Sequence, residues 1–157
     1  MTGAAGSVEG RLADLGMTLP EVAAPVAAYV PAVRSGNLVW SSGQLPFVNG
    51  EMTVTGKVGA GIEPDAAKEL ARICALNALA ALKTEVGDLD RVRRVVKVVG
   101  FVASAPSFFG QPGVVNGASE LLGEVFGDAG RHARSAVGVA ALPLDAPVEV
   151  EVVVEVG

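Results

Sequence analysis

The order of secondary-structure elements that the sequence predicts is typical of an α+β fold. Apolar runs and alternating patterns predict three strands, then a helix, a strand, a second helix and two closing strands. This order suits two helices packed on one face of a mostly antiparallel sheet, with one crossover connection between parallel strands. The chain has 157 residues, which is the size of one domain with a substantial core.

The composition fits this architecture and argues against several classes of protein. Half of the residues are apolar, mostly Ala and Val, which suit closely packed helices and strands. The net charge of −5 argues against a general nucleic-acid binder, which needs a basic surface. A single cysteine excludes an internal disulfide and suits the reducing cytoplasm, where we expect the protein to reside. Neither a signal peptide nor an apolar run of membrane-spanning length is evident, so we expect no membrane partner.

A short helix and an irregular connector are expected before the sheet. Ser7 is a suitable N-cap, and Gly16 a suitable end, for a helix over residues 7–15. The connector that follows contains Pro20 and Pro25, which interrupt regular structure.

Three strands are expected next. Residues 29–34 and 38–42 are predicted to form a hairpin, because Ser35-Gly36-Asn37 between them can adopt the positive φ of a tight turn. A third strand is expected over residues 52–57, after the turn at Asn49-Gly50.

Two helices flank a central strand in the second half of the chain. Pro64 suits the first turn of a helix that ends near Val86, before Gly87; its Asn77 is expected to hydrogen-bond to a loop. The nearly continuous apolar run over residues 94–103 predicts a strand covered on both faces. The second helix is predicted over residues 112–126.

The closing strands, residues 135–141 and 148–156, are expected to form a hairpin. In the second strand the valines at even positions share one face, and Glu149 and Glu151 lie on the other. If the valine faces of both strands are buried together, Arg134 shares the remaining face with these glutamates. Its neighbours there are small, namely Ala136, Gly138 and Ala140. A guanidinium and carboxylates above small side chains would suit a small polar ligand; an ordinary two-sided sheet with its charges in water is the alternative.

Several blocks of this sequence match a known pattern. The first is Ala133–Pro143 followed closely by Val148–Glu151, the second is Gly36–Pro46, and the third is Val115-Asn116. Together they resemble the signature of the Rid family, the YjgF-like reactive-intermediate deaminases, some of which carry an older description as endoribonucleases. Tyr29 is similar to a tyrosine of the same family.

The resemblance begins at about residue 24 and continues to the C-terminus. We therefore expect residues 24–157 to form one Rid-like domain and residues 1–23 an N-terminal extension with a short helix. Many deaminating members have a cysteine where this chain has Ala136, and an acidic or amide residue where it has Gly138. These departures indicate a longer, divergent subgroup.

The resemblance implies a fold, an assembly and an activity. The fold is the chorismate-mutase-like one, with six mostly antiparallel strands and two helices on one face. The assembly is a homotrimer whose sheets close into a barrel, with sites in the clefts between subunits. The activity is hydrolytic deamination of small 2-imino or 2-enamino acids, such as 2-aminoacrylate, to 2-keto acids and ammonia, without a cofactor.

The matching positions also imply roles for individual residues. Arg134 would bind the carboxylate of the substrate through two parallel hydrogen bonds, and Glu149 would orient or activate water. The remaining substrate contacts would come from backbone N–H groups and polar side chains, the tyrosine and the asparagine from across a subunit boundary. These residues are Tyr29, Ser42, Gly43, Asn116 and Ala136.

Other functions stay open. A non-catalytic protein that binds 2-keto acids or amino acids in the same cleft is suggested by Ala136, by Gly138 and by the N-terminal extension. RNA cleavage is disfavoured by the acidic charge and the few aromatic residues available for base stacking. No metal site is expected, because His132 is the only histidine and no Cys/His spacing is present. We expect His132 to be a loop residue.

Overall fold

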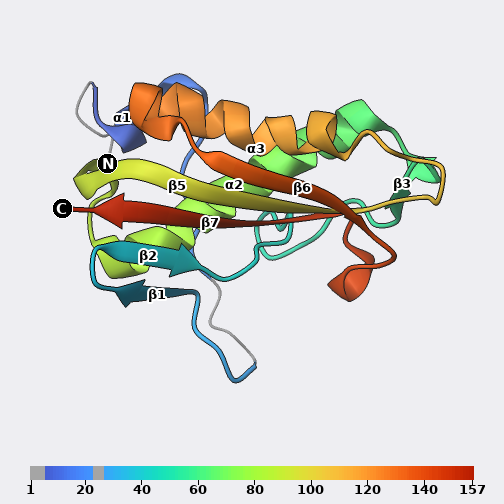
Figure 1. The fold of residues 1–157 in the computed structure, drawn as a ribbon, viewed down its shortest axis with the longest axis horizontal. Coiled ribbons are helices and arrows are strands. Elements are labelled where there is room, and N and C mark those ends of the chain that lie inside the picture. Colours follow the sequence, from blue (N-terminus) through green and yellow to red (C-terminus); the bar gives the residue numbers. More distant parts are fainter. Residues whose placement is uncertain (1–5, 23–26) are drawn as a thin grey trace.

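The computed structural model describes residues 6–22 and 27–157, and Figure 1 shows a twisted sheet with helices along one face. Pro25 and the predicted domain boundary between residues 23 and 24 lie outside the described residues. The elements are α1 (Val8–Asp14), β1 (Ala32–Ser35), β2 (Leu38–Ser41), β3 (Lys57–Val58), β4 (Gly61–Ile62), α2 (Pro64–Val86), β5 (Val92–Ala103), α3 (Gln111–Phe126), β6 (Ala133–Val139) and β7 (Val148–Val156).

The main sheet has the strand order β1-β2-β7-β5-β6. Within this sheet only β5 and β6 pair in parallel, and α3 makes the crossover between them. The other neighbours pair antiparallel. The predicted α+β class, with helices on one face of a mostly antiparallel sheet and one crossover, is therefore confirmed. No helix within the described ranges is both long and apolar enough to cross a lipid bilayer.

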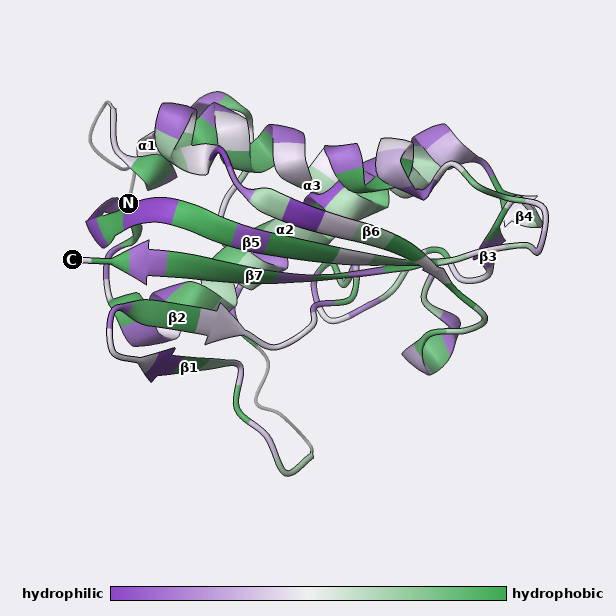
Figure 2. Ribbon diagram, in the orientation of Figure 1, coloured by the Kyte–Doolittle hydropathy of each residue, from purple (hydrophilic) through white to green (hydrophobic). Residues whose placement is uncertain are grey.

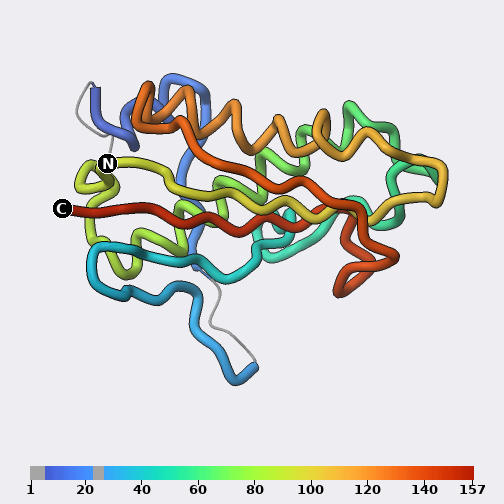
Figure 3. Tube along the Cα trace, viewed as in Figure 1, coloured from blue at the N-terminus to red at the C-terminus, as the bar shows by residue number. Residues whose placement is uncertain are grey.

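The N-terminal helix α1 is joined to the rest of the domain by several contacts. Ser7 is its N-cap, as predicted, because the Ser7 Oγ accepts a hydrogen bond from the Gly10 N–H at 2.9 Å. Arg11 donates to the Val125 carbonyl at the end of α3 at 2.8 Å, and Figure 3 shows these segments side by side. Leu12 is almost completely buried, so α1 contributes to the core.

The predicted third strand does not join the main sheet, which has five strands rather than six in the described part of the chain. Lys57–Val58 instead pairs with Gly61–Ile62 in a separate two-stranded ladder. Gly56 and Gly59 have φ values of 121° and 88°, which turn the chain sharply and leave no room for a longer strand.

The predicted closing hairpin is wrong, because β5 lies between β7 and β6. Val98 of β5 is paired with Arg134 on one side and with Val152 on the other. Laterally paired residues point to the same face of a sheet, so Arg134 lies on the helix-covered face with the valines of β7. Phe101 is paired with Glu149, which lies on the open face. The expectation that Arg134 and the glutamates share one face is therefore also wrong.

The valines of β6 do not mark a buried face of the sheet, because β6 is an edge strand. Val137 is 43% exposed on the open face, whereas the alternate valines of β7 are fully buried under the helices. Figure 2 shows hydrophilic residues among the hydrophobic ones along β5 and β7, and in β7 the glutamates lie on the face opposite the buried valines, as expected for a strand with one core face.

Helix α3 packs closely against both the sheet and α2 because two glycines lack side chains at the contacts. A Cβ atom on Gly117 would overlap the carbonyl oxygen of Lys68 in α2. A Cβ atom on Gly100 of β5 would overlap the methyl groups of Val115 in α3. These two contacts fix the height of α3 above β5 and β6.

Replacing Gly117 by Ala should destabilise the fold by about 1–3 kcal/mol, since the new methyl group meets a backbone oxygen that cannot easily move. Gly123→Ala in the same helix is the matched control, because its Cβ would meet nothing within 4 Å. Removal of a helical glycine there should stabilise by about 0.5–1 kcal/mol. Urea unfolding of both variants tests this, and equal effects would contradict the close-approach account.

Candidate functional site

The predicted site residues fall into two groups in the structure. The arginine group consists of Arg134 and Ala136 on β6, with Asn116 on α3. The glutamate group lies at the other side of the sheet, around the end of β2. It consists of Glu149 on β7 with Tyr29, Ser42 and Gly43.

In the arginine group, α3 holds one side of the Arg134 guanidinium. Nη1 donates to the Asn116 Oδ1 at 2.7 Å and to the Ser119 Oγ at 3.2 Å, and Nη2 donates to the Pro112 carbonyl at 3.4 Å. Asn116 and Ser119 are one helical turn apart and so lie on the same face of α3. The expectation that the asparagine comes from across a subunit boundary is wrong with respect to Arg134, because the two are bonded within one chain.

Arg134 keeps unused hydrogen-bonding capacity. An arginine has five N–H donors, and the three bonds above leave the Nε–H and one Nη2–H without a partner among residues 6–22 and 27–157. The side chain is half-buried, and none of the salt bridges within the described residues includes it. A positive fork of donors is therefore oriented by neutral oxygens and left open to an anion.

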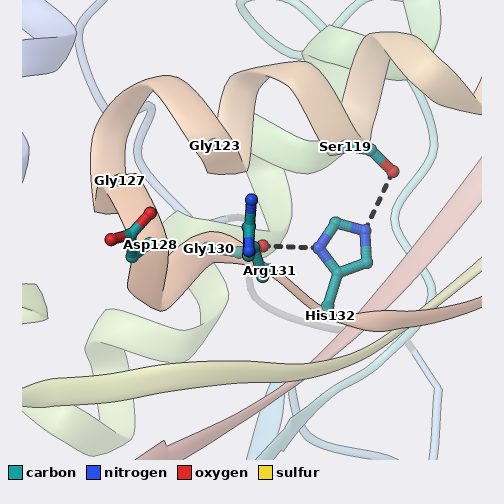
Figure 4. A pocket seen from close by; sticks show the side chains of 7 residues that line it. All are labelled: Ser119, Gly123, Gly127, Asp128, Gly130, Arg131 and His132. Atoms are coloured by element: carbon teal, nitrogen blue, oxygen red, sulfur yellow. Dashed lines mark hydrogen bonds between the residues drawn. The ribbon is translucent and has the colours of Figure 1, made fainter.

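Ser119 and His132 extend this network, and neither role was predicted from the sequence. Figure 4 shows the His132 ring between the Ser119 hydroxyl and the Gly130 carbonyl, at 2.9 Å and 2.6 Å from its two nitrogens. His132 lies in the segment before β6, as expected, but its ring reaches back to α3. The available signals were the one-turn spacing of Ser119 from Asn116, and the placement of His132 two residues before Arg134.

Two surface hollows lie beside the arginine group. The one in Figure 4 measures about 550 Å³ and contains Ser119, Arg131 and His132 in its lining. The other shares Arg131 and His132 and extends to Arg94. Arg134 does not line either hollow, so both hollows border the network at His132 rather than at the guanidinium.

In the glutamate group, Glu149 packs against a residue without a side chain. A Cβ atom on Gly43 would lie 2.5 Å from the Glu149 Oε2. The Gly43 N–H has no hydrogen-bond partner in the described part of the chain. The Ser42 Oγ donates to the Val30 carbonyl at 2.6 Å, which holds the segment of Tyr29 beside Gly43. The Tyr29 side chain is 58% exposed.

Helix α2 positions the loop that carries Gly43. The Asn77 Nδ2 donates to the carbonyls of Leu45 and Phe47 at 2.9 and 3.0 Å. The prediction that Asn77 hydrogen-bonds to a loop is confirmed. Mutual backbone bonds between Gln44 and Val150, at 2.8 and 3.0 Å, join the same loop to β7 next to Glu149.

Burial raises the pKa of the Glu149 carboxyl group above its ordinary value, and the neighbouring charge of Glu151 raises it further. A carboxyl group with a raised pKa is better suited to exchange protons near neutral pH. Burial also raises the pKa of the Cys74 thiol well above its ordinary value, which makes it a poor nucleophile.

One chain does not bring Arg134 and Glu149 to the same small molecule. They point from opposite faces of the sheet and are separated by two strand spacings and three residue steps along β5. Such an offset corresponds to roughly 14 Å between the Cα atoms. Among residues 6–22 and 27–157, no three His, Cys, Asp or Glu side chains are grouped so as to hold a metal ion.

Comparisons with known proteins agree with this fold. Residues 9–156 match the family model described as "YjgF/chorismate mutase-like, putative endoribonuclease". Protein TCP17 of Trypanosoma cruzi is 48% identical over 153 residues, which cover 97% of this chain and 96% of that protein.

Two solved structures match nearly the whole length of this chain. The protein Atu1372 of unknown function from Agrobacterium tumefaciens is 51% identical with a TM-score of 0.90, over 96% of this chain and 92% of that one. A "putative endoribonuclease" from Shewanella oneidensis is 34% identical with a TM-score of 0.92, over 96% and 99% of the two chains. The match over almost every described residue, together with the strand order, shows that this chain belongs to the YjgF/chorismate-mutase-like family.

Proposed function

We propose that the protein hydrolyses small 2-imino and 2-enamino acids to 2-keto acids and ammonia, in clefts formed between chains. The observation that carries the proposal is the Arg134 guanidinium, which is held on one side and open on the other. A planar pair of N–H donors matches the two oxygens of a carboxylate, and bidentate pairs of this kind are strong and directional. Because α3 fixes Nη1 in advance, little further ordering is needed when the substrate binds.

We infer that the clefts belong to a homotrimer. Helices cover only one face of the sheet, and the open face exposes Trp40 and Val33 by about half of their surfaces. Phe101 and Val99 on the same face are half-buried within the single chain. An apolar sheet face with free edges is stabilised when other copies cover it, and a closed ring of three copies would do so.

Such a ring would also join the two groups of site residues. The arginine group lies at the β6 edge of the sheet, and the glutamate group lies beside the β1–β2 edge. If the β6 edge of one chain meets the β1–β2 edge of the next, Arg134 of the first chain faces Glu149 and Gly43 of the second. Tyr29 and Ser42 of the second chain would then surround the polar end of the substrate.

In this cleft, Arg134 would hold the carboxylate while water adds to the imine carbon. Glu149 would accept a proton from the attacking water and pass it to the imine nitrogen. It would then move the hydroxyl proton of the tetrahedral intermediate to the amino group, so that the C–N bond breaks to give ammonia and the keto acid. An enamine would first be protonated on its terminal carbon to give the imine. Proton transfer by a positioned carboxyl group typically contributes about 100- to 10,000-fold. No metal or organic cofactor takes part in this scheme.

Two other functions make different predictions. A protein that only binds 2-keto acids or amino acids would use the same Arg134 fork without turnover. RNA cleavage would follow the description of the family, but the net charge is −5, and the exposed aromatic side chains of Tyr29, Trp40 and Phe109 lie on separate segments.

A coupled assay tests the function directly. A pyridoxal-phosphate-dependent serine dehydratase generates 2-aminoacrylate, and semicarbazide competes with the protein for the imine. We expect the protein to restore keto-acid release and Arg134→Ala to abolish this effect. Arg131→Ala should retain it, since that variant removes the same charge from an exposed neighbour.

Failure of the wild-type trimer to restore keto-acid release would contradict the deaminase proposal. Calorimetric binding of 2-ketobutyrate that disappears in Arg134→Ala would then support the binding function. Full activity in Arg134→Ala would reject Arg134 as the carboxylate site.

The raised pKa of Glu149 predicts a pH dependence of stability. Unfolding returns this carboxyl group to its ordinary pKa of 4.5, so above that pH the folded chain holds more protons than the unfolded chain. The free energy of unfolding should therefore fall as the pH rises from 4.5 through the raised pKa. Glu149→Gln should remove this fall, and Glu155→Gln on the same face should not. Urea titrations across the acid range test this; identical pH profiles for Glu149→Gln and the wild type would contradict it.

A further inference from the structure

We propose that Ser119 and His132 form a positioning relay that fixes the Arg134 guanidinium for carboxylate binding. The inference rests on the proposed function, because it gives these two residues a role in the affinity for the same substrate. Neither residue belongs to the groups predicted from the sequence, and neither touches the reacting atoms in the proposed cleft. They are therefore positioning residues.

The direction of each hydrogen bond in the relay follows from the chemistry of its partners. The Gly130 carbonyl can only accept, so the Nδ1 of His132 must carry the hydrogen of that 2.6 Å bond. In the neutral ring the Nε2 then accepts from the Ser119 hydroxyl at 2.9 Å. The Ser119 oxygen is left with lone pairs that accept from Arg134 Nη1 at 3.2 Å.

The relay completes the hold on Arg134. Asn116 takes one Nη1 hydrogen and Ser119 takes the other, so this end of the guanidinium is fixed in both position and rotation. Without Ser119, Nη1 would be held by Asn116 alone, and only the longer bond from Nη2 to the Pro112 carbonyl, at 3.4 Å, would oppose turning of the guanidinium. The two holds together keep the Nε–H and the remaining Nη2–H directed away from α3, where a carboxylate can meet them.

The hydroxyl of Ser119 also depends on the imidazole. A serine hydroxyl rotates freely unless an acceptor fixes it, and a hydroxyl that pointed its hydrogen at Arg134 would repel the guanidinium. His132 supplies that acceptor, and the Gly130 carbonyl fixes the ring in turn. The hollow in Figure 4 leaves the outer side of the relay open to solvent.

Nitrogen-15 NMR of the full-length protein tests the relay without reference to catalysis. At a pH where the His132 ring is neutral, the imidazole spectrum of the wild type should show the hydrogen on Nδ1. Rotation about the Arg134 Cζ–Nη1 bond should be slow in the wild type and faster in Ser119→Ala. A ring with its hydrogen on Nε2, or an unchanged rotation rate, would overturn the proposal.

Steady-state kinetics give the second test. Ser119→Ala and His132→Phe should raise KM about tenfold while kcat stays within about twofold, because a bond to a charged group is lost at the carboxylate end only. Ser119→Thr keeps the hydroxyl and should restore KM to within about threefold of the wild-type value. Ser107→Ala, an exposed loop serine, is the control for serine removal.

The outcomes separate this inference from the proposed function. A wild-type protein without deaminase activity would reject the function, whereas the NMR result would still decide the relay. An active wild type with unchanged KM in Ser119→Ala would reject the relay and leave the function standing. Circular dichroism and the oligomer size of each variant exclude unfolding as the cause of a raised KM.

Discussion

The close approach of α3 to the sheet is the constraint on which the arginine group depends. Gly117 allows the backbone of α3 to contact the Lys68 carbonyl, and Gly100 of β5 leaves room for the side chain of Val115. The height that these contacts set puts Asn116 within 2.7 Å of Arg134, which projects from the neighbouring strand β6. A helix displaced outward by the width of a methyl group would lose these short bonds, because hydrogen bonds weaken steeply with distance and angle.

The same one-sided arrangement of helices explains why the site is divided. Helices on one face give Arg134 its fixed partners, and the bare opposite face leaves Glu149 half-buried beside Gly43. Within one chain the two groups face away from each other. The open face and the free β6 edge that separate them are also the surfaces that a neighbouring copy would cover, so the proposed assembly and the proposed site depend on the same feature.

Local signals predicted the elements but not all of their neighbours. Pro64 and Gly87 marked the ends of α2, and alternation along residues 148–156 gave β7 with its bounds. The closing hairpin was wrong because strands that are consecutive in sequence usually pair, and no residue in β6 or β7 indicates that β5 lies between them. The wrong prediction for the face on which Arg134 lies followed from that error.

The contacts of the site were predicted less completely than its residues. Asn116 and Arg134 were recognised from the resemblance to the Rid family, but their contact depends on the packing of α3. Ser119 and His132 are ordinary residues for a helix and a loop, and only the fold brings them together.

Mixing two inactive variants tests the central claim that Arg134 of one chain and Glu149 of the next share a site. Arg134→Ala and Glu149→Gln chains would be co-expressed with different tags, and the mixed trimers purified and assayed for keto-acid release. We expect the purified mixed trimers to regain about a third of the wild-type sites, since around each closed ring of three one adjacent pair combines an intact arginine with an intact glutamate. Mixed trimers as inactive as the parent variants would contradict the composite site.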